Sequence, residues 1–171
     1  MEKKRVVVLT GAGMSAESGL KTFRDAHGLW EGRDVMEVAS PQGFARNPEL
    51  VLKFYNQHKR QLKKVKPNAG HLALADLETQ FAVNIITQNV DNLHEKAGSS
   101  SVLHLHGELT KVRSTQNENY ILDWTEDLVM GDLDESGHQL RPHIVWFGEM
   151  VPMLEPAIEI TSKADILVII G

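Results

Sequence analysis

The chain has 171 residues, of which 42% are hydrophobic and 24% charged, the balance of an ordinary globular domain. That length is enough for one compact domain, or for one domain with a small insertion. The formal net charge of -5 comes from 18 basic and 23 acidic residues spread along the chain. Because no basic face stands out, we do not expect nucleic acid to be a partner.

The sequence contains no cysteine, which excludes disulfides, thiolate catalysis and a zinc site built from cysteines. Near the N-terminus, the apolar run Val6 to Leu9 passes directly into a glycine-rich turn. It is too short for a signal-peptide core or a membrane span. We therefore expect a cytoplasmic protein without membrane contact.

Short β-branched runs alternate with amphipathic segments along the chain. Buried strands are predicted at 5–10, 81–87, 142–147 and 165–170, and a strand with alternating faces at 102–106. Helices are predicted from Pro48 after an Asn47 cap, and at 69–79, 91–97 and 154–163. This alternation favours an α/β fold, a Rossmann-like parallel sheet with helices on both faces plus a small inserted domain.

The predicted sheet domain takes residues 1–34, 69–112 and 142–171, with a helical insertion at 35–68. Residues 113–141 are polar and acidic without a long apolar run, which indicates a small β-rich module. The last predicted strand ends at Gly171, where the ligand loops of such a sheet begin. We therefore expect the sheet to be incomplete at its C-terminal end.

The first strand is followed by Gly11-x-Gly13-x-x-Ala16 and a helical segment, which satisfies the dinucleotide fingerprint by context as well as by letters. A plain strand-to-helix turn is the alternative. A hydride-transferring dehydrogenase would continue into a second strand ending in an acid near position 30. Residues 24–30 do not form such a strand, which counts against redox chemistry.

Several polar residues follow the later strands. His106 can accept a proton at neutral pH, and Arg24 can reach a phosphate. Asn89 and Asp91 suit ribose hydroxyls and a carboxamide, or they cap the next helix. Together with two further histidines, His94 and His104, His106 could suggest a metal, although a histidine satisfied by hydrogen bonds is the commoner state.

These residues, with their neighbours, resemble the sirtuin family, and most closely its bacterial class III deacylases. The motifs that carry the resemblance follow in family order from Arg5 to Gly171: Gly11 to Leu20, Thr22 to Asp25, Gly28 to Trp30, Pro67 to His71, Thr87 to His94, His106 to Leu109 and Phe147 to Glu149.

The resemblance implies a deacylase that consumes NAD. The acyl-lysine carbonyl oxygen attacks the ribose carbon as nicotinamide leaves, which gives an alkylamidate. His106 resembles the base that activates a ribose hydroxyl, and the products are free lysine, nicotinamide and O-acyl-ADP-ribose. Acyl-lysine proteins or peptides are the implied partners. The implied NAD-binding residues are Gly11, Ala12, Gly13, Ser15, Ala16, Glu17, Phe23, Arg24, Trp30, Gln88, Asn89, Val90 and Asp91.

The chain departs from the family in the segment that often holds a structural zinc. Ser114 stands where the first zinc cysteine is expected, and the chain contains no cysteine at all. We therefore expect no metal, and a module held by a hairpin and its own packing with Trp124 as an anchor.

The acyl-binding helix departs as well. Class III members read acidic acyl groups with a Tyr-x-x-Arg pair, whereas here Tyr55 is followed by His58. A neutral histidine offers one hydrogen bond in place of a charged fork, so desuccinylation or demalonylation should be weakened and should rise as His58 becomes charged. Ala39 leaves room for a longer acyl chain. The peptide is expected to pair with the backbone near Val145, Phe147, Gly148 and Glu149.

Two other functions stay open. The same cleavage of NAD could serve mono-ADP-ribosyl transfer to a protein. Family members also continue beyond the position of Gly171, so the resemblance implies a C-terminally truncated chain. A non-catalytic NAD- or peptide-binding fragment is the third alternative.

Overall fold

The computed structural model describes residues 2–21 and 29–171. The chain forms two compact units. The first, here called the sheet unit, contains Met1–Thr22, Val65–His106 and Val151–Gly171. The second, here called the mixed unit, contains Phe23–Lys64 and Gly107–Met150.

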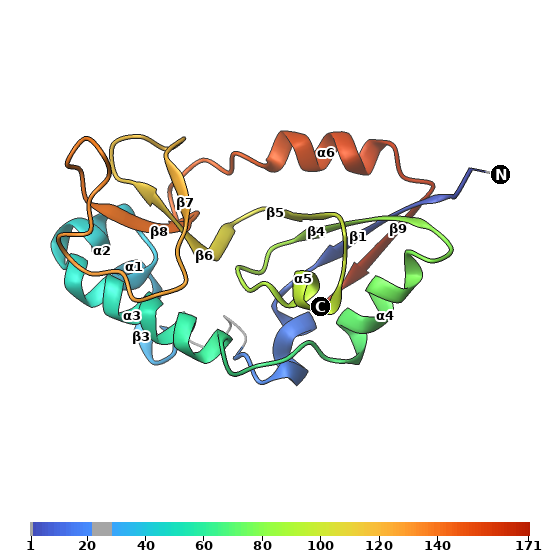
Figure 1. The fold of residues 1–171 in the computed structure, drawn as a ribbon, viewed down its shortest axis with the longest axis horizontal. Helices are drawn as coiled ribbons and strands as arrows, with labels where there is room; N and C mark the ends of the chain where they lie inside the picture. The colour runs from blue at the N-terminus through green and yellow to red at the C-terminus, as the bar shows by residue number, and fades with distance from the viewer. Residues whose placement is uncertain (1, 22–28) are drawn as a thin grey trace. The chain divides into compact units, whose positions relative to one another are not determined.

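The sheet unit is built on four parallel strands in the order β5-β4-β1-β9 (Figure 1). These strands are β1 (Arg5–Thr10), β4 (Ala82–Thr87), β5 (Val102–His104) and β9 (Ile166–Ile170). In the central register, Val8 of β1 lies opposite Ile85 of β4 and Val168 of β9. The helices of this unit are the 3-10 helix η1 (Ala12–Ser18), α4 (Ala69–Leu77), α5 (Leu93–Ala97) and α6 (Leu154–Ser162).

Alternate residues of β1 enter two different cores, because successive side chains of a strand point to opposite faces. Val8 packs with Met14 of η1 and Leu74 of α4. Val7 packs with Ala157 of α6. Helices therefore cover both faces of a parallel sheet, which confirms the predicted α/β fold class.

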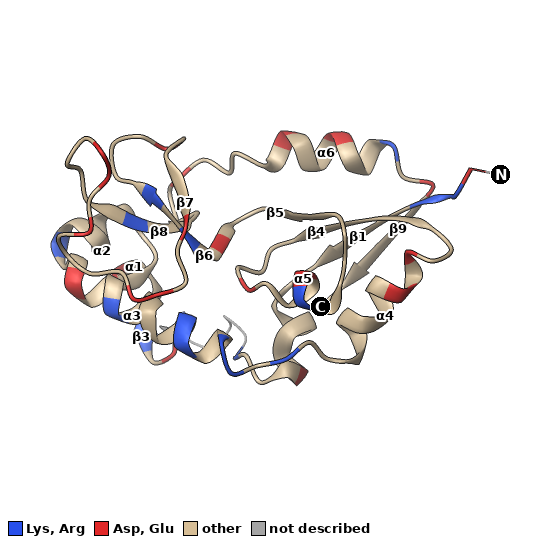
Figure 2. Cartoon of the chain, viewed as in Figure 1, with Lys and Arg blue, Asp and Glu red and all other residues tan. Residues whose placement is uncertain are grey.

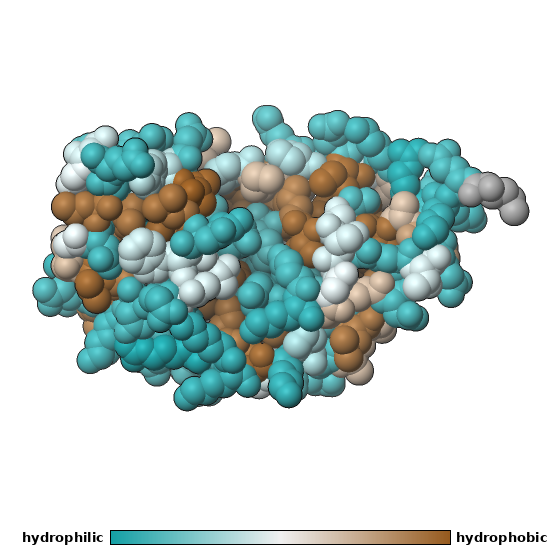
Figure 3. All heavy atoms as spheres, in the orientation of Figure 1, coloured by the Kyte–Doolittle hydropathy of each residue, from teal (hydrophilic) through white to brown (hydrophobic). Residues whose placement is uncertain are grey.

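Apolar side chains also reach the surface, as the brown areas of the view in Figure 3 show. On β9, the outermost strand in the sheet order, Leu167 is 50% exposed and Ile169 is 72% exposed. Within the described residues, no helix is both long enough and apolar enough to cross a membrane.

In its described residues, 29–64 and 107–150, the mixed unit combines three helices with two small antiparallel sheets. The helices are α1 (Val35–Val38), α2 (Pro41–Arg46) and α3 (Pro48–Leu62). The hairpin pairs β2 (Leu29–Trp30) with β3 (Arg33–Asp34), and the other sheet has the order β7-β6-β8. Its strands are β6 (Gly107–Ser114), β7 (Ile121–Asp123) and β8 (Leu140–Ile144). As predicted, Pro48 begins α3 and the Asn47 side chain caps it.

Three sequence-based expectations about these elements are wrong. The segment 142–147 does not join the parallel sheet, because β8 pairs antiparallel with β6, with Arg141 opposite Arg113. The strand predicted at 102–106 ends at His104, which places His106 in a turn rather than on the face that carries His104. Part of the loop predicted before Val35 is the β2–β3 hairpin, where the turn puts Gly32 at a φ of 77°.

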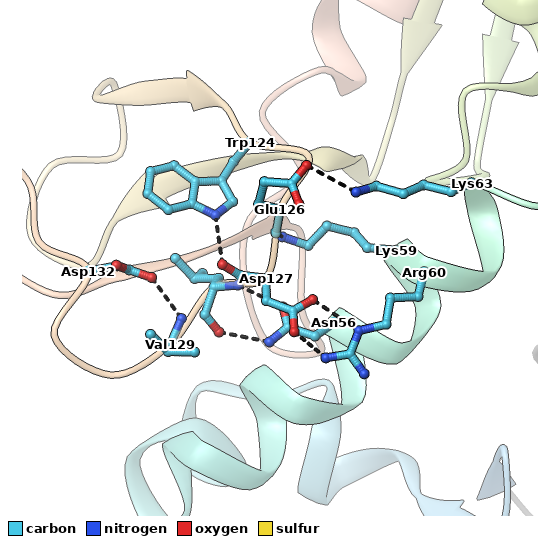
Figure 4. Close-up of polar contacts among 10 residues, drawn as sticks. Asn56, Lys59, Arg60, Lys63, Trp124, Glu126, Asp127, Val129 and Asp132 are labelled. Carbon is cyan, nitrogen blue, oxygen red and sulfur yellow. Dashed lines mark hydrogen bonds and ion pairs between the residues drawn. The ribbon is translucent and has the colours of Figure 1, made fainter.

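Helix α3 anchors the loop between β7 and β8 (Figure 4). The amide of Asn56 both donates to and accepts from the backbone of Leu128, at 2.9 Å each. Lys59 donates to the backbone carbonyl of Glu126 at 2.8 Å and is only 4% exposed. Burial lowers the pKa of Lys59 to about 8. Trp124 packs against the apolar core that includes Leu128, as expected of an anchor.

Ion pairs also join basic side chains of α3 to acidic side chains of the loop between β7 and β8. Arg60 pairs with Asp127, and Lys63 pairs with Glu126. Figure 2 shows basic positions in blue along α3 and acidic positions in red on the loop between β7 and β8. The basic run of α3 is therefore used partly inside the unit, although its exposed ion pairs add little stability individually.

Candidate active site

The segment 11–16, here called the glycine loop, follows β1 at the carboxyl edge of the sheet. The backbone N–H of Gly11 donates to the carbonyl of Ile170 at 3.0 Å, and that of Gly13 donates to Gly171 at 3.3 Å. A Cβ on Gly11 would overlap the Gly171 carbonyl oxygen. Glycine is required at this position because the backbone that follows β9 approaches the loop so closely.

Polar side chains that follow β4 fasten this loop. Asn89 donates from its amide to the Gly11 carbonyl at 2.8 Å. The hydroxyl of Ser15 donates to the Asp91 carboxylate at 2.8 Å. Asn89 and Asp91 are buried, with exposures of 8% and 7%. Asp91 also accepts from the backbone N–H of Leu93 at 3.0 Å, so it acts at the start of α5 as well as at the loop.

A third contact comes from the segment that precedes α4. The Asn68 amide donates to the Met14 carbonyl at 2.8 Å and to the Ser18 hydroxyl at 3.1 Å. Its carbonyl oxygen caps α4 together with His71. Asn68 belongs to a motif of the sirtuin resemblance, yet its role at the loop cannot be read from sequence because the contact spans two separate elements.

His106 lies in the turn after β5, at the same edge of the sheet. Its Nδ1 is 3.1 Å from the backbone carbonyl oxygen of Gln88, which follows β4. A carbonyl oxygen only accepts hydrogen bonds, so Nδ1 carries the proton in this contact. Nε2 of the neutral ring then holds a lone pair, which is the state that a general base requires.

His104 has a different environment two residues earlier. Its Nδ1 is 2.9 Å from the Asn89 carbonyl, and its Nε2 is 2.5 Å from a carboxylate oxygen of Glu95. Because both nitrogens face acceptors, we interpret His104 as an imidazolium paired with Glu95. Burial, the largest single effect on Glu95, raises the pKa of its carboxyl group, but the hydrogen bond and the charge of His104 together with smaller contributions lower it overall.

A buried histidine pair lies in the interior of the sheet unit. The rings of His71 and His94 are 4.8 Å apart, and the two residues are 0% and 1% exposed. His94 Nε2 is 3.0 Å from the Thr10 hydroxyl. Burial lowers the pKa of both rings, for His94 to about 4 with a further contribution from the charge of His71. Both rings are therefore neutral at neutral pH.

In the mixed unit, aromatic rings surround the residues predicted to read the acyl group. The ring of Trp30 lies 5.9 Å from Tyr55 and 5.1 Å from His58. Tyr55 is fully buried, and its hydroxyl oxygen accepts a hydrogen bond from the Trp146 indole at 2.9 Å. His58 Nδ1 is 2.8 Å from the Phe54 carbonyl.

The segment 145–149 is held by two buried arginines. Arg141 makes a two-pronged contact with Glu149, at 2.8 and 2.9 Å, and its guanidinium lies 3.5 Å from the centre of the Trp146 ring. Arg113 reaches the same carboxylate at 2.9 Å. The Phe147 N–H donates to the Ala39 carbonyl at 2.9 Å, and the Phe147 side chain is 48% exposed. Val145 is half-buried, and Gly148 has a φ of 87°.

The structure therefore groups the predicted residues within each unit. Gly11, Ser15, Asn89 and Asp91 form one hydrogen-bonded set, and Gln88 meets His106. Ala12, Gly13, Ala16, Glu17 and Val90 lie in the same two segments. Trp30 packs against α3, and Ala39 lies beside Phe147. Phe23 and Arg24 lie outside the described residues, and all of these roles stay predictions.

Sequence reasoning missed Trp146, Arg113 and Arg141. A buried arginine can be inferred from sequence only when its partner is known, and Glu149 lies 36 residues from Arg113. Trp146 stands between two predicted substrate residues, Val145 and Phe147. Alternation along the strand predicted at 142–147 would put it on the opposite side from them, which is the available signal for its inward position, although β8 itself ends at Ile144.

The sequence profile described as "Sir2 family" matches residues 11–171. The chain belongs to the Sir2 family. This confirms the sirtuin resemblance for nearly the whole chain.

The chain is 61% identical over 168 residues to an NAD-dependent protein deacylase of Helicobacter pylori (strain ATCC 700392 / 26695), covering 98% of this chain and 73% of that protein. It is 58% identical over 174 residues to a protein of the same name from Bacteroides thetaiotaomicron, covering 98% of the chain and 74% of the relative. These relatives confirm the predicted enzyme class, an NAD-dependent protein deacylase.

Solved structures agree with this assignment. A Sir2 homologue in complex with ADP-ribose has a TM-score of 0.90 at 43% identity, with 99% of this chain and 70% of that chain covered. A Sir2 homologue in complex with NAD has a TM-score of 0.87 at 43% identity, with 99% and 68% covered. A Sir2 variant with a deacetylated p53 peptide and 3'-O-acetyl ADP-ribose has a TM-score of 0.81 at 30% identity, with 99% and 72% covered.

Proposed function

We propose that this chain removes short acyl groups from lysine side chains and transfers them to the ADP-ribose part of NAD, with release of nicotinamide. We propose that it is a deacylase of the bacterial class III type. The proposal is supported by its membership of the Sir2 family and by relatives at about 60% identity named NAD-dependent protein deacylase.

The observation that carries the proposal is the contact between His106 Nδ1 and the Gln88 carbonyl at 3.1 Å. It fixes the tautomer in which Nε2 accepts a proton. A general base at the carboxyl edge of a parallel sheet, next to a glycine loop, suits removal of a proton from a ribose hydroxyl.

The residues of the sheet unit fit NAD. The glycine loop lies at the carboxyl edge of central strand β1, where α/β proteins bind dinucleotides, and it is followed by η1. NAD supplies an electrophilic ribose carbon from which nicotinamide leaves. Ser15 and Asp91 hold the shape of the loop, and the exposed Gln88 and half-buried Val90 offer groups beside it.

Acetyl and other short uncharged acyl groups are the proposed substrates, carried on proteins or peptides. Removal of succinyl or malonyl groups should be weak near neutral pH because His58 is neutral there. Burial lowers the pKa of His58 below its ordinary value of 6.5, against smaller opposing effects of the Phe54 carbonyl and Glu31. At position 58 a carboxylate would meet a neutral ring where an arginine would supply a charged fork.

We also propose that the module between β6 and β8 folds without zinc. Support comes from the absence of cysteine and from the contacts of α3 with the module. The Ser114 hydroxyl accepts from the backbone N–H groups of Gln116 and Asn117 at 3.1 and 3.2 Å. A hydrogen bond from Ser114 also lowers the pKa of Asp134.

The test is incubation of the chain with NAD and acetyl- or succinyl-lysine peptides, followed by mass spectrometry of all products. Free lysine peptide, nicotinamide and O-acyl-ADP-ribose are expected. Protein that gains ADP-ribose without loss of the acyl group would indicate mono-ADP-ribosyl transfer instead. Binding of NAD or peptide without turnover would leave only the binding-fragment function. Zinc per chain is measured in the same preparation, and a stoichiometric amount would contradict the zinc-free module.

A further inference from the structure

The two residues that follow β4 hold their carbonyl oxygens toward two histidines. The Gln88 carbonyl lies 3.1 Å from His106 Nδ1, and the next carbonyl, that of Asn89, lies 2.9 Å from His104 Nδ1. His104 is the last residue of β5, and His106 lies in the turn that follows. The contact that fixes the tautomer of His106 therefore has a second contact of the same kind one residue further along the chain.

The backbone of Asn89 links these two carbonyls. A peptide group is planar, so the Gln88 carbonyl and the Asn89 N–H move as one rigid unit. The Asn89 N–H donates to the Thr87 hydroxyl oxygen at 3.0 Å, and the Asn89 carbonyl belongs to the next peptide plane. His104 holds that second plane. Only the φ and ψ of Asn89 separate it from the carbonyl that meets His106.

Glu95 of α5 determines which protons His104 carries. A carboxylate oxygen of Glu95 lies 2.5 Å from His104 Nε2, and the His104 side chain is only 6% exposed. With a carboxylate at Nε2 and a carbonyl at Nδ1, both ring nitrogens need a proton, so the ring is a charged donor to the Asn89 carbonyl. Without Glu95, a neutral ring would be free to place its single proton on Nε2 and leave that carbonyl without a donor.

The side chain of Asn89 serves the glycine loop at the same time. Its amide donates to the Gly11 carbonyl at 2.8 Å and to the Ser15 hydroxyl at 3.3 Å. Asn89 thus holds the loop through its side chain and borders the His106 contact through its backbone. Since a displacement of about 1 Å can cost about 100-fold in rate, the position of this residue bears directly on catalysis.

Resting on the deacylase function proposed above, we propose that Glu95 and His104 are positioning residues for the base His106. The pair holds the Asn89 carbonyl, which keeps the Gln88 carbonyl in line with His106 Nδ1. His106 Nε2 is then left with the lone pair that takes the ribose proton. Glu95 and His104 act through the backbone and touch neither NAD nor the acyl-lysine. An ion pair that only stabilises the fold is the alternative, and it would not change the tautomer of His106.

Two variants of His104 separate its contacts with Asn89 and Glu95. His104→Ala removes both, whereas the amide of His104→Asn takes the place of Nδ1 and can still donate to the Asn89 carbonyl. With an acetyl-lysine peptide and saturating NAD, kcat should fall by about tenfold in His104→Ala and by less than about threefold in His104→Asn. Glu155→Gln, at an exposed glutamate of α6, is the matched control for a lost charge and should keep the wild-type rate.

Comparison with His106→Ala separates positioning from general stabilisation. Exchange of labelled nicotinamide into NAD should persist in His104→Ala while deacetylation falls. Adding His104→Ala to His106→Ala should lower deacetylation no further, because the contact acts through His106. Circular dichroism checks that each variant is folded. Should His104→Ala fail to fold, Glu95→Ala, at a side chain that is 38% exposed, replaces it with the same expected direction.

The tautomer of His106 is also measured without turnover. Nitrogen NMR of the chain with isotope-labelled histidine distinguishes a proton on Nδ1 from a proton on Nε2, and the His106 signals are assigned by their loss in His106→Ala. At about pH 8, the wild-type chain and His104→Asn should carry the His106 proton on Nδ1. In His104→Ala it should move largely to Nε2.

The proposal is overturned if His106 keeps its proton on Nδ1 in His104→Ala, if His104→Asn is no better than His104→Ala, or if the losses in the double variant add. These outcomes leave the deacylase function standing as long as the wild-type chain cleaves acetyl-lysine. If it cleaves no acyl-lysine, the proposed function fails, and the NMR spectra still decide whether the Glu95–His104 pair fixes the ring of His106.

Discussion

The side-chain amide of Asn56 forms two hydrogen bonds with the backbone of Leu128, one donated and one accepted, each 2.9 Å long. The amide therefore pairs with the loop much as a neighbouring strand would. Both groups are buried, so losing either bond would leave unsatisfied polar atoms in the interior. This contact attaches the cysteine-free module to the helix that carries Tyr55 and His58.

The first prediction is that Asn56→Ala lowers the free energy of unfolding by about 2–4 kcal/mol, because both Leu128 backbone groups lose their partner. Urea unfolding followed by circular dichroism measures this change. The chelator EDTA should leave the transition of the wild-type protein unchanged. A transition that shifts with EDTA, together with a change below about 0.5 kcal/mol in Asn56→Ala, would mean that a metal holds the module instead.

The second prediction concerns the hydrogen bond from the Ser15 hydroxyl to the Asp91 carboxylate. Ser15→Ala should raise the KM for NAD by about tenfold, because hydrogen bonds to a charged group contribute about 1.5–3 kcal/mol. Asp91→Ala should have a larger effect, since Leu93 also loses its partner. A double-mutant cycle on the KM for NAD should show coupling of at least about 1 kcal/mol. Additive effects would indicate that this bond does not shape the loop.

The third prediction is loss of stability in acid from the buried histidine pair. The pKa of His94 is about 4 in the folded chain, below the ordinary value of 6.5, so the unfolded chain binds more protons between these values. Stability is fully present above about pH 6.5 and falls by up to about 3 kcal/mol as the pH approaches 4. Urea unfolding across this range measures the slope. His94→Gln should flatten the slope, and an identical slope in the variant would contradict this origin.

The fourth prediction is the pH dependence of acyl preference. His58 has a lowered pKa, so it becomes charged only as the pH falls below about 6.5. The ratio of desuccinylase to deacetylase rate should stay flat from about pH 8 to 6.5 and rise below that. Initial rates on matched peptides measure the ratio, with His58→Ala as the control that abolishes the rise. A rise that begins near pH 8, or one that persists in His58→Ala, would exclude His58 as its source.

Features that are local in sequence could be predicted from it. The strand Arg5–Thr10, the glycine loop and the Asn47–Pro48 start of α3 each depend on neighbouring residues alone. The sequence predicts His106 as the last residue of a strand at 102–106, and the turn that takes it off this strand was not expected.

Features set by distant contacts could not be predicted. The segment at Pro142 has the composition of a buried strand in either sheet, and only its pairing with β6 places it in the mixed unit. The hydroxyl oxygen of Tyr55 accepts a hydrogen bond from the indole of Trp146, which lies 91 residues away in the chain. Which ring nitrogen of His58 carries the proton depends on the contact between Nδ1 and the Phe54 carbonyl, one turn earlier in α3. The identity of the residue does not specify this contact.

The central claim, that His106 acts as the base after nicotinamide has left, is tested most directly by His106→Ala. Two rates are measured on the same preparation with an acetyl-lysine peptide: deacetylation, and exchange of labelled nicotinamide into NAD. We predict that deacetylation falls by about 10²–10⁴-fold, as for loss of a general base, while exchange persists. Deacetylation that persists, or an equal loss of both rates, would contradict this role for His106.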